Sequence, residues 1–211
     1  MEKLDQFQPM IIDKDWLKKS ATSEMIFDNS NPLILDIGCG AGNFLSQIAE
    51  LNKKFNFIGI DLNYKRLFKG ARKVMRKKLD NVKLLRSKAE YIEEYFAENS
   101  LSGVFINFPD PWPKNKHRKN RLLSKEFSLK LYRLLHKSGF IYFKTDYLPY
   151  YKEVKEIFSA KFSSITKDNS SLKEIELTIK DTVQQSITSE FEDIFLDKQE
   201  SIYSIIWRKT P

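Results

Sequence analysis

The sequence predicts an α/β fold in which a mostly parallel, doubly wound sheet carries an antiparallel hairpin at one edge. Three observations support this prediction. Short apolar runs alternate with segments of helical periodicity, a glycine-rich turn follows the first apolar run, and two late strand-like segments come without helices. Strands and helices that alternate through short connections form a mostly parallel sheet with helices on both faces.

The first part of the domain supplies three strands and two helices. Strands are predicted at residues 33–37, 55–60 and 82–86, and Asp61 follows the second of them. A helix at residues 43–52 is supported by an apolar face made of Phe44, Leu45, Ile48, Ala49 and Leu51. A second helix, at residues 63–78, has one apolar face, and a separate basic face made of Lys65, Lys69, Arg72 and Arg76.

The second part continues the alternation and then becomes harder to interpret. We expect a short helix at residues 91–97, a strand at 104–107, a helix that Ser124 caps and that ends near residue 136, a strand at 140–144 and a helix at 150–160. Residues 174–179 and 202–207 are the strands of the expected hairpin. Residues 1–32 are interpreted as an N-terminal extension and residues 33–211 as one domain.

Composition limits the class of protein. The chain has 211 residues and a net charge of +8, which favours a polyanionic partner, although a solvated lysine-rich surface is the alternative. A single cysteine excludes an internal disulfide and a cysteine-based zinc site, and no metal is expected. The sequence shows no signal-peptide pattern and no apolar run near the roughly 18 residues of a membrane span. We therefore expect a cytoplasmic protein, either a monomer or a homodimer, that does not bind membranes.

The turn after the first strand has the pattern of a cofactor site. It reads Asp-Ile-Gly-Cys-Gly-Ala-Gly from Asp36 to Gly42, so its third glycine comes one residue earlier than in the dinucleotide pattern G-x-G-x-x-G. This spacing disfavours a dehydrogenase. A carboxylate at Asp36 would repel a pyrophosphate and favour a ligand with an ammonium group. Asp61 can accept hydrogen bonds from ribose hydroxyls, although either Asp could simply form a turn.

The segment from Asn107 to Lys114, Asn-Phe-Pro-Asp-Pro-Trp-Pro-Lys, is predicted to be a stiff loop at a strand end. Proline fixes φ and removes a backbone donor, so neither a helix nor a central strand can continue through a segment with three prolines. Asp110 could accept the two donors of a guanine Watson–Crick edge. Trp112 could stack on a base, but packing under the loop is favoured. Five basic residues between Lys114 and Arg121 predict phosphate contacts, with a solvated charge run as the alternative.

Together with Phe57–Asp61, Lys144–Asp146 and Ser189–Glu192, these motifs resemble the tRNA (guanine-N7-)-methyltransferase family. The resemblance implies a Rossmann-like, S-adenosylmethionine-dependent methyltransferase that modifies the variable-loop guanine of tRNA (position 46 in tRNA numbering). It implies that Asp110 is catalytic and that the cofactor contacts are Asp36, Gly38, Gly40, Gly42, Asp61, Lys88, Ala89, Asn107 and Asp110. It implies substrate contacts at Lys114, Asp146, Ser189, Glu190, Phe191 and Glu192. The implied RNA contacts are Lys116, His117, Arg118, Lys119, Asn120 and Arg121.

Three departures from the family pattern keep alternatives open. Lys88 stands before Ala89 where the family has an acid for the adenine ring, so backbone atoms or Glu90 would have to replace it. Ser189 stands where threonine is usual, and residues 160–186 match little of the family. An exocyclic-amine methyltransferase is one alternative, although Phe108 and Asp110 break its Asn/Asp-Pro-Pro-aromatic loop. A non-catalytic tRNA-binding scaffold is the other, and Lys88 favours it.

Overall fold

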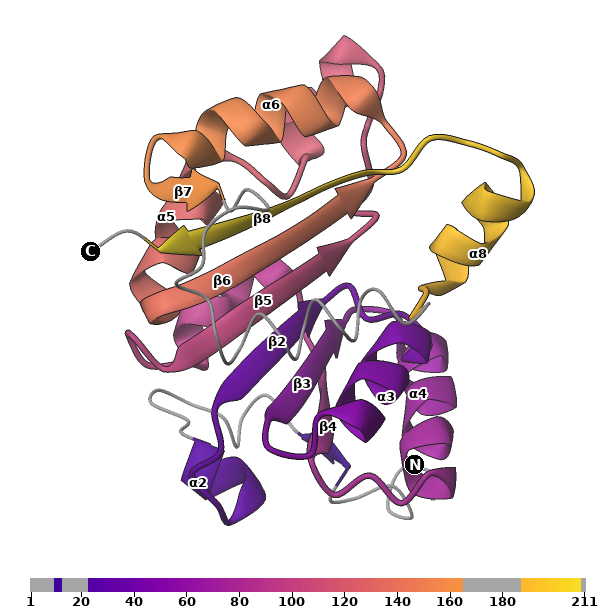
Figure 1. Ribbon diagram of the computed structural model, residues 1–211, viewed down its shortest axis with the longest axis vertical. Helices are drawn as coiled ribbons and strands as arrows, with labels where there is room; N and C mark the ends of the chain where they lie inside the picture. The colour runs from indigo at the N-terminus through magenta and orange to yellow at the C-terminus, as the bar shows by residue number, and fades with distance from the viewer. Residues whose placement is uncertain (1–9, 13–22, 165–186, 210–211) are drawn as a thin grey trace.

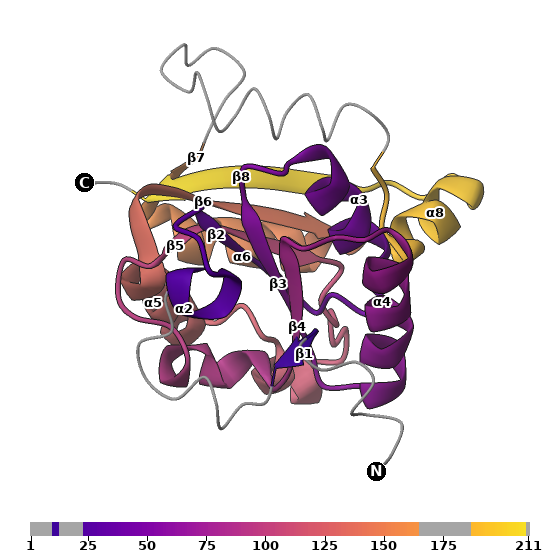
Figure 2. The ribbon, with the colours of Figure 1, turned by 90° about the horizontal axis from the view of Figure 1, so that it is seen from below.

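The computed structural model describes residues 10–12, 23–164 and 187–209, and they form one eight-stranded sheet covered by helices on both faces (Figures 1 and 2). The strand order is β1-β4-β3-β2-β5-β6-β8-β7, and the first six of these strands are parallel. The strands are β1 (Ile11–Ile12), β2 (Leu33–Ile37), β3 (Asn56–Asp61), β4 (Val82–Arg86), β5 (Leu101–Asn107), β6 (Leu135–Thr145), β7 (Phe162–Ser164) and β8 (Tyr203–Lys209).

The helices divide between the two faces because side chains of a buried strand alternate between them. Ile34 packs with the apolar residues of one helical layer, whereas Leu33 and Leu35 pack with the other. The first layer contains α3 (Asn43–Leu51) and α4 (Tyr64–Arg76). The second contains α2 (Ser23–Phe27), the 3-10 helix η1 (Ala89–Glu94), α5 (Lys125–Leu134) and α6 (Leu148–Ser159). Two further elements, η2 (Asn115–Asn120) and α8 (Glu190–Asp197), lie at the carboxyl edge of the sheet.

The predicted fold class is confirmed, and its helix signals are visible in the structure. The side chain of Asn63 accepts a hydrogen bond from the Arg66 N–H at the start of α4, and Ser124 does the same for Phe127 at the start of α5. Such caps satisfy backbone donors that the first helical turn leaves free. No helix in the described part of the chain is long and apolar enough to cross a membrane.

Several boundaries differ from the sequence prediction, since β5 begins at Leu101 instead of residue 104, and a 3-10 helix at Ala89–Glu94 stands where a helix at 91–97 was expected. Helix α5 ends at Leu134, two residues before the expected end, and β6 begins at Leu135 instead of residue 140. The early start of β6 comes with the pairing of Leu135 with Leu101, whereas Phe140 pairs with Gly103, where a Cβ would lie 2.1 Å from its ring. The pairing of β5 with β6 also shifts register between Leu101 and Gly103, an irregularity that residue patterns do not show.

The antiparallel edge is confirmed, and β8 matches the strand expected at residues 202–207. Strand β8 pairs with β6 and with β7, both antiparallel, so β7 at residues 162–164 occupies the outer position. The strand expected at residues 174–179 lies outside the described residues. Within residues 1–32, β1 adds a parallel strand beside β4, and α2 contributes Ile26 to the core. The boundary between extension and domain stays a prediction.

Candidate active site

Three predicted cofactor residues, Asp36, Asp61 and Asn107, lie at strand ends on the carboxyl edge of the sheet. Strand β2 has β3 on one side and β5 on the other, so the chain order reverses direction between β2 and β5. In open α/β sheets, ligands bind beyond the carboxyl ends of the strands at such a switch point. Asp36 lies on β2, and Asn107 ends β5 one residue beyond the pair formed by Ile37 and Ile106. The structure therefore brings the glycine turn and the proline-rich loop to one location.

The glycine turn is fixed by hydrogen bonds that its backbone N–H groups donate to the end of β3. Gly38, Gly40 and Gly42 all have positive φ, at 76°, 56° and 69°, which only glycine adopts without strain. The Gly38 N–H donates to the Ile60 carbonyl at 2.8 Å, and the Gly40 N–H donates to Asp61 Oδ2 at 2.9 Å. Asp61 Oδ1 accepts from the Asn63 N–H at 2.7 Å. Asp61 therefore holds the turn, and each carboxylate oxygen keeps a further lone pair for a ligand.

Asp36 is the most strongly perturbed acid in this region. Its side chain is 2% exposed, and burial raises its pKa to about 7, with a smaller upward effect from the charge of Asp61. Asn107 opposes this shift because its amide faces the carboxyl group, although neither amide atom of Asn107 completes a hydrogen bond of normal geometry with a described residue. A buried acid beside an unsatisfied amide is an arrangement that a polar, positively charged ligand would complete.

Cys39 has a packing role in the turn. A Cβ on Gly59 would lie 2.7 Å from Cys39 Sγ, so the thiol occupies the space that this glycine leaves open. Burial, followed by the charges of Asp36 and Asp61, raises the thiol pKa well above its usual value. A protonated thiol is a poor nucleophile, which agrees with the expectation of a small residue packed in the turn.

A cleft that is partly open to solvent lies beside the glycine turn. Four segments form its walls: β2 with the glycine turn, the start of α3, the end of β5 and the start of α8. Helix α4 adds one further side chain, Arg66. The lining residues are Asp36, Gly38, Cys39, Gly40, Ala41, Asn43, Phe44, Arg66, Asn107, Ser189, Glu190 and Phe191. Of the other predicted site residues, Gly42, Asp61, Lys88, Ala89, Asp110, Lys114, Asp146 and Glu192 are outside this lining.

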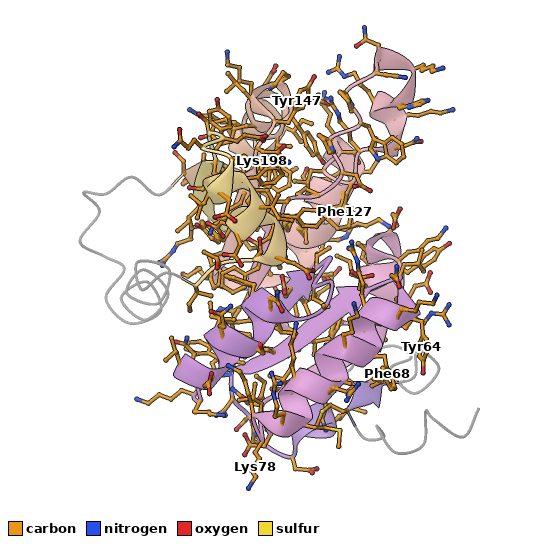
Figure 3. All side chains as sticks on the ribbon, turned by 90° about the vertical axis from the view of Figure 1, so that its right-hand side faces the viewer. Tyr64, Phe68, Lys78, Phe127, Tyr147 and Lys198 are labelled. Carbon is orange, nitrogen blue, oxygen red and sulfur yellow. The ribbon has the colours of Figure 1, made fainter. Side chains whose placement is uncertain are left out.

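Helix α8 comes from far along the chain to close one side of the cleft. Figure 3 shows it from the outside, with Lys198 at its end, and with α4 below it running from Tyr64 towards Lys78. Ser189 and Glu192 form a capping box, since the Glu192 N–H donates to the Ser189 hydroxyl and the Ser189 N–H donates to the Glu192 carboxylate. The same carboxylate accepts from Lys144 Nζ at 2.6 and 2.8 Å. Lys144 is 4% exposed, so this ion pair is largely buried.

The proline-rich loop is held by a buried arginine. Arg121, 8% exposed, donates from Nε to the Pro111 carbonyl at 2.7 Å and from Nη2 to the Trp112 carbonyl at 3.3 Å. It also pairs with Glu153 and lies over the Tyr150 ring. The half-buried Trp112 contacts His117 edge to face, at 5.6 Å between ring centroids. This contact agrees with packing of Trp112 under the loop, and it leaves Asp110 exposed.

The six expected RNA contacts differ in how much surface they offer. Lys116 and Lys119 are exposed on η2 and have no hydrogen bond or ion pair with any residue described. Arg118 is exposed but donates to Glu153 at 2.8 Å. Arg121 is buried and holds the proline-rich loop, so it offers little surface, and its RNA contact stays a prediction. The His117 ring contacts the Trp112 ring edge to face and is half-buried.

Three residues of this region were not predicted from the sequence. Lys144 gave a weak signal, because a lysine within the apolar strand Phe140–Thr145 needs a partner, but Glu192 is 48 positions away. The sequence gives no signal for Glu153, because its partner Arg121 lies 32 residues away in the chain. Arg66 was one of several basic residues in its helix, and only the folded chain shows that it lines the cleft. No cluster of metal-binding side chains occurs within the described ranges.

Comparisons with known proteins agree with this geometry. The family described as "Putative methyltransferase" matches residues 30–205. The chain is 40% identical to a tRNA (guanine-N(7)-)-methyltransferase of Geobacter metallireducens, covering 70% of this chain and 71% of the relative. It is 33% identical to an Enterococcus faecalis protein of the same name, over 85% of this chain and 81% of the relative.

Two further similarities are more limited. A bifunctional glycosyltransferase/methyltransferase of Fusobacterium nucleatum is 37% identical over 92% of this chain, but the chain spans only 30% of that relative's length. The solved structure of the 16S rRNA methyltransferase KamB has a TM-score of 0.61 and covers 91% of this chain and 96% of its own, at 13% identity. At that level of identity, the structural similarity concerns the fold alone.

Proposed function

The chain belongs to the tRNA (guanine-N7-)-methyltransferase family, and from this premise we propose that it transfers the methyl group of S-adenosylmethionine to N7 of a guanine in tRNA. The observation that carries the proposal is the meeting of two loops at the switch point of the sheet. One loop follows the buried Asp36 at the end of β2, and the other begins at Asn107 and presents Asp110. The reaction is expected in the cytoplasm.

The residues beside the cleft fit the expected cofactor. The buried Asp36 carboxylate would receive an ammonium group, and the unsatisfied Asn107 amide offers a further donor and acceptor. Asp61 would receive ribose hydroxyls, and the glycine turn leaves room because no Cβ projects from it. Lys88, exposed at the start of η1, cannot accept from an adenine amino group, so the adenine contact would come from the backbone at Lys88 and Ala89 or from Glu90.

The chain's residues need only to position and stabilise the reacting groups. When bound, S-adenosylmethionine supplies a methyl group activated by its sulfonium. Guanine N7 has a free lone pair and loses no proton, so no strong general base is required. Asp110 would accept hydrogen bonds from the N1–H and N2–H₂ donors, and its charge would stabilise the cationic product, with help from Asp146. Alignment of two reactants contributes up to roughly 7–11 kcal/mol.

Helix α8 divides the expected substrate contacts into two groups. Ser189 and Glu192 are engaged with each other and with Lys144, so we assign them the role of holding α8 in place. Glu190 and Phe191 face the cleft and are exposed, so they would contact the substrate together with Lys114 and Asp146. Lys116 and Lys119 would bind the tRNA backbone. Displacing the target base from the tRNA fold costs a few kcal/mol, which phosphate contacts would offset.

The test is incubation of the purified protein with an unmodified tRNA transcript and labelled cofactor, followed by mapping of the methylated atom. The expected product is 7-methylguanosine in the variable loop, and replacing guanosine 46 by adenosine should remove it. A methyl group on an exocyclic amine would favour the alternative methyltransferase class. Binding of both tRNA and cofactor with no transfer under any condition would favour a non-catalytic scaffold.

A further inference from the structure

We propose that Arg66 binds the carboxylate at the amino-acid end of the cofactor, while Asp36 receives the ammonium group of the same end. The inference rests on the proposed function, since it deepens the assignment of S-adenosylmethionine to the cleft. It adds a residue that the glycine turn and the family motifs do not contain. A basic residue on this wall would give the cleft two opposite charges, which match a zwitterion.

The position of Arg66 differs from that of its neighbours on α4. The Arg66 backbone is fixed in the first helical turn by the Asn63 cap, and its guanidinium extends towards the glycine turn. The Nη1 atom lies 4.0 Å from the place where a Cβ on Gly40 would be, and the guanidinium carbon lies 5.8 Å from the centroid of the Phe191 ring. Arg66 therefore lines the cleft between the turn and α8.

The surroundings of Arg66 favour an anion from outside the protein. Helix α4 has six basic residues and no acidic one, and Arg66 has no salt bridge with any residue that the structure describes. Glu190 also lines the cleft, but its charge acts on Lys73, whose ammonium donates to the Ala41 carbonyl at 2.9 Å. A guanidinium presents parallel N–H donors that match both oxygens of a carboxylate. The free cation at the cleft thus complements the carboxylate of the same amino-acid end whose ammonium group Asp36 receives.

Lys65 and Lys69 provide the internal comparison. Both are exposed on the same helix, and neither belongs to the cleft lining. If Arg66 acted only through the positive field of α4, a change at Lys69 would have a similar effect. If it contacts a carboxylate directly, only Arg66 will matter, and only for ligands that carry a carboxylate.

The experiment measures binding by calorimetry, without tRNA, for two ligands that differ in one group. S-adenosylmethionine has the carboxylate, and decarboxylated S-adenosylmethionine lacks it. We expect Arg66→Gln to weaken binding of S-adenosylmethionine by at least tenfold and to change binding of the decarboxylated ligand by less than twofold. Arg66→Lys should fall between, because it keeps the charge but loses the paired donors. Lys69→Gln should leave both affinities within twofold of the unchanged protein.

Two results would overturn the inference. Equal weakening of both ligands by Arg66→Gln would show that the residue acts through Phe191 and the placement of α8. Unchanged binding of S-adenosylmethionine would show that no contact exists. Either result leaves the proposed function intact, because the unchanged protein still binds the cofactor. Failure of the unchanged protein to bind S-adenosylmethionine at all would instead overturn the proposed function together with this inference.

Discussion

The two sides of the cleft are held by different kinds of contact. The glycine turn is fixed by backbone N–H groups that donate to Ile60 and Asp61, at most 22 positions away in the chain. The proline-rich loop and α8 are fixed by the side chains of Arg121 and Lys144, whose acidic partners lie 32 and 48 positions away. The cofactor side is thus held by the backbone donors of the glycine turn, whereas side-chain ion pairs position the substrate side.

The largest expected effect separates chemistry from cofactor binding. Asp110→Ala should lower kcat by about 10²–10³-fold, the range typical for loss of one group that stabilises a transition state. Because Asp110 is exposed and lies outside the cleft lining, cofactor affinity should change by less than about threefold, the scale of a weak surface contact. Single-turnover methylation measures the rate of methyl transfer, and calorimetry measures the cofactor affinity. Full activity in the variant would remove Asp110 from the mechanism.

The second effect belongs to the cofactor side. Asp36→Asn should weaken S-adenosylmethionine binding by about 10–100-fold, since it removes a buried charge opposite an ammonium group.

The same variant should be more stable without ligand. The folded-state pKa of Asp36 is raised, so ionising the buried carboxyl lowers stability as the pH rises from about 4 to about 7. At pH 8 the free energy of unfolding should increase by roughly 1–3 kcal/mol. A less stable, tightly binding variant would contradict both expectations.

The third effect tests the clamp of the substrate side. Arg121→Gln removes a buried guanidinium that holds two carbonyls and Glu153, and should lower the free energy of unfolding by about 1–3 kcal/mol. Arg118→Gln is the matched control, because Arg118 pairs with the same Glu153 carboxylate from an exposed position and should cost less than about 1 kcal/mol. Thermal unfolding compares the two. Equal losses would show that the burial of Arg121 does not matter.

The fourth effect is the pH dependence of cofactor binding. Asp36, with a pKa of about 7, must lose its proton to pair with an ammonium group. Affinity should therefore rise by up to about tenfold per pH unit between pH 5.5 and 7, below the range where the ligand's own amine titrates. Calorimetry in buffers of different ionisation enthalpy would detect the released proton. Asp36→Asn should show a flat profile, and a profile that falls over this window would contradict the assignment.

The smallest effect concerns the tRNA surface. Lys116→Ala combined with Lys119→Ala should weaken tRNA binding a few-fold and reduce the slope of log K against log salt by about 2, roughly one for each lysine. Both residues are exposed and have no partner within the described segments, so stability should not change. Filter binding at several salt concentrations measures the slope. An unchanged slope would remove η2 from the RNA surface.

The same contrast explains what could be predicted from the sequence. The glycine turn, Asp36, Asp61 and the strands that deliver them follow from local patterns, because the turn follows its strand directly and its hydrogen bonds reach residues at most 22 positions away. The proline-rich loop could be located, but not the burial of Arg121, since it depends on Glu153 from α6. Likewise, the pairing of β7 with β8 and the extension of β6 to Leu135, which pairs with Leu101, depend on contacts between segments that are distant in sequence.

The central claim is that cofactor and guanine meet at the switch point between β2 and β5. The most direct test is a crystal structure with S-adenosylhomocysteine bound. The account predicts the ligand in the cleft, with its amino group against Asp36 and its ribose against Asp61. Density for the ligand away from the glycine turn and Asn107 would contradict the claim.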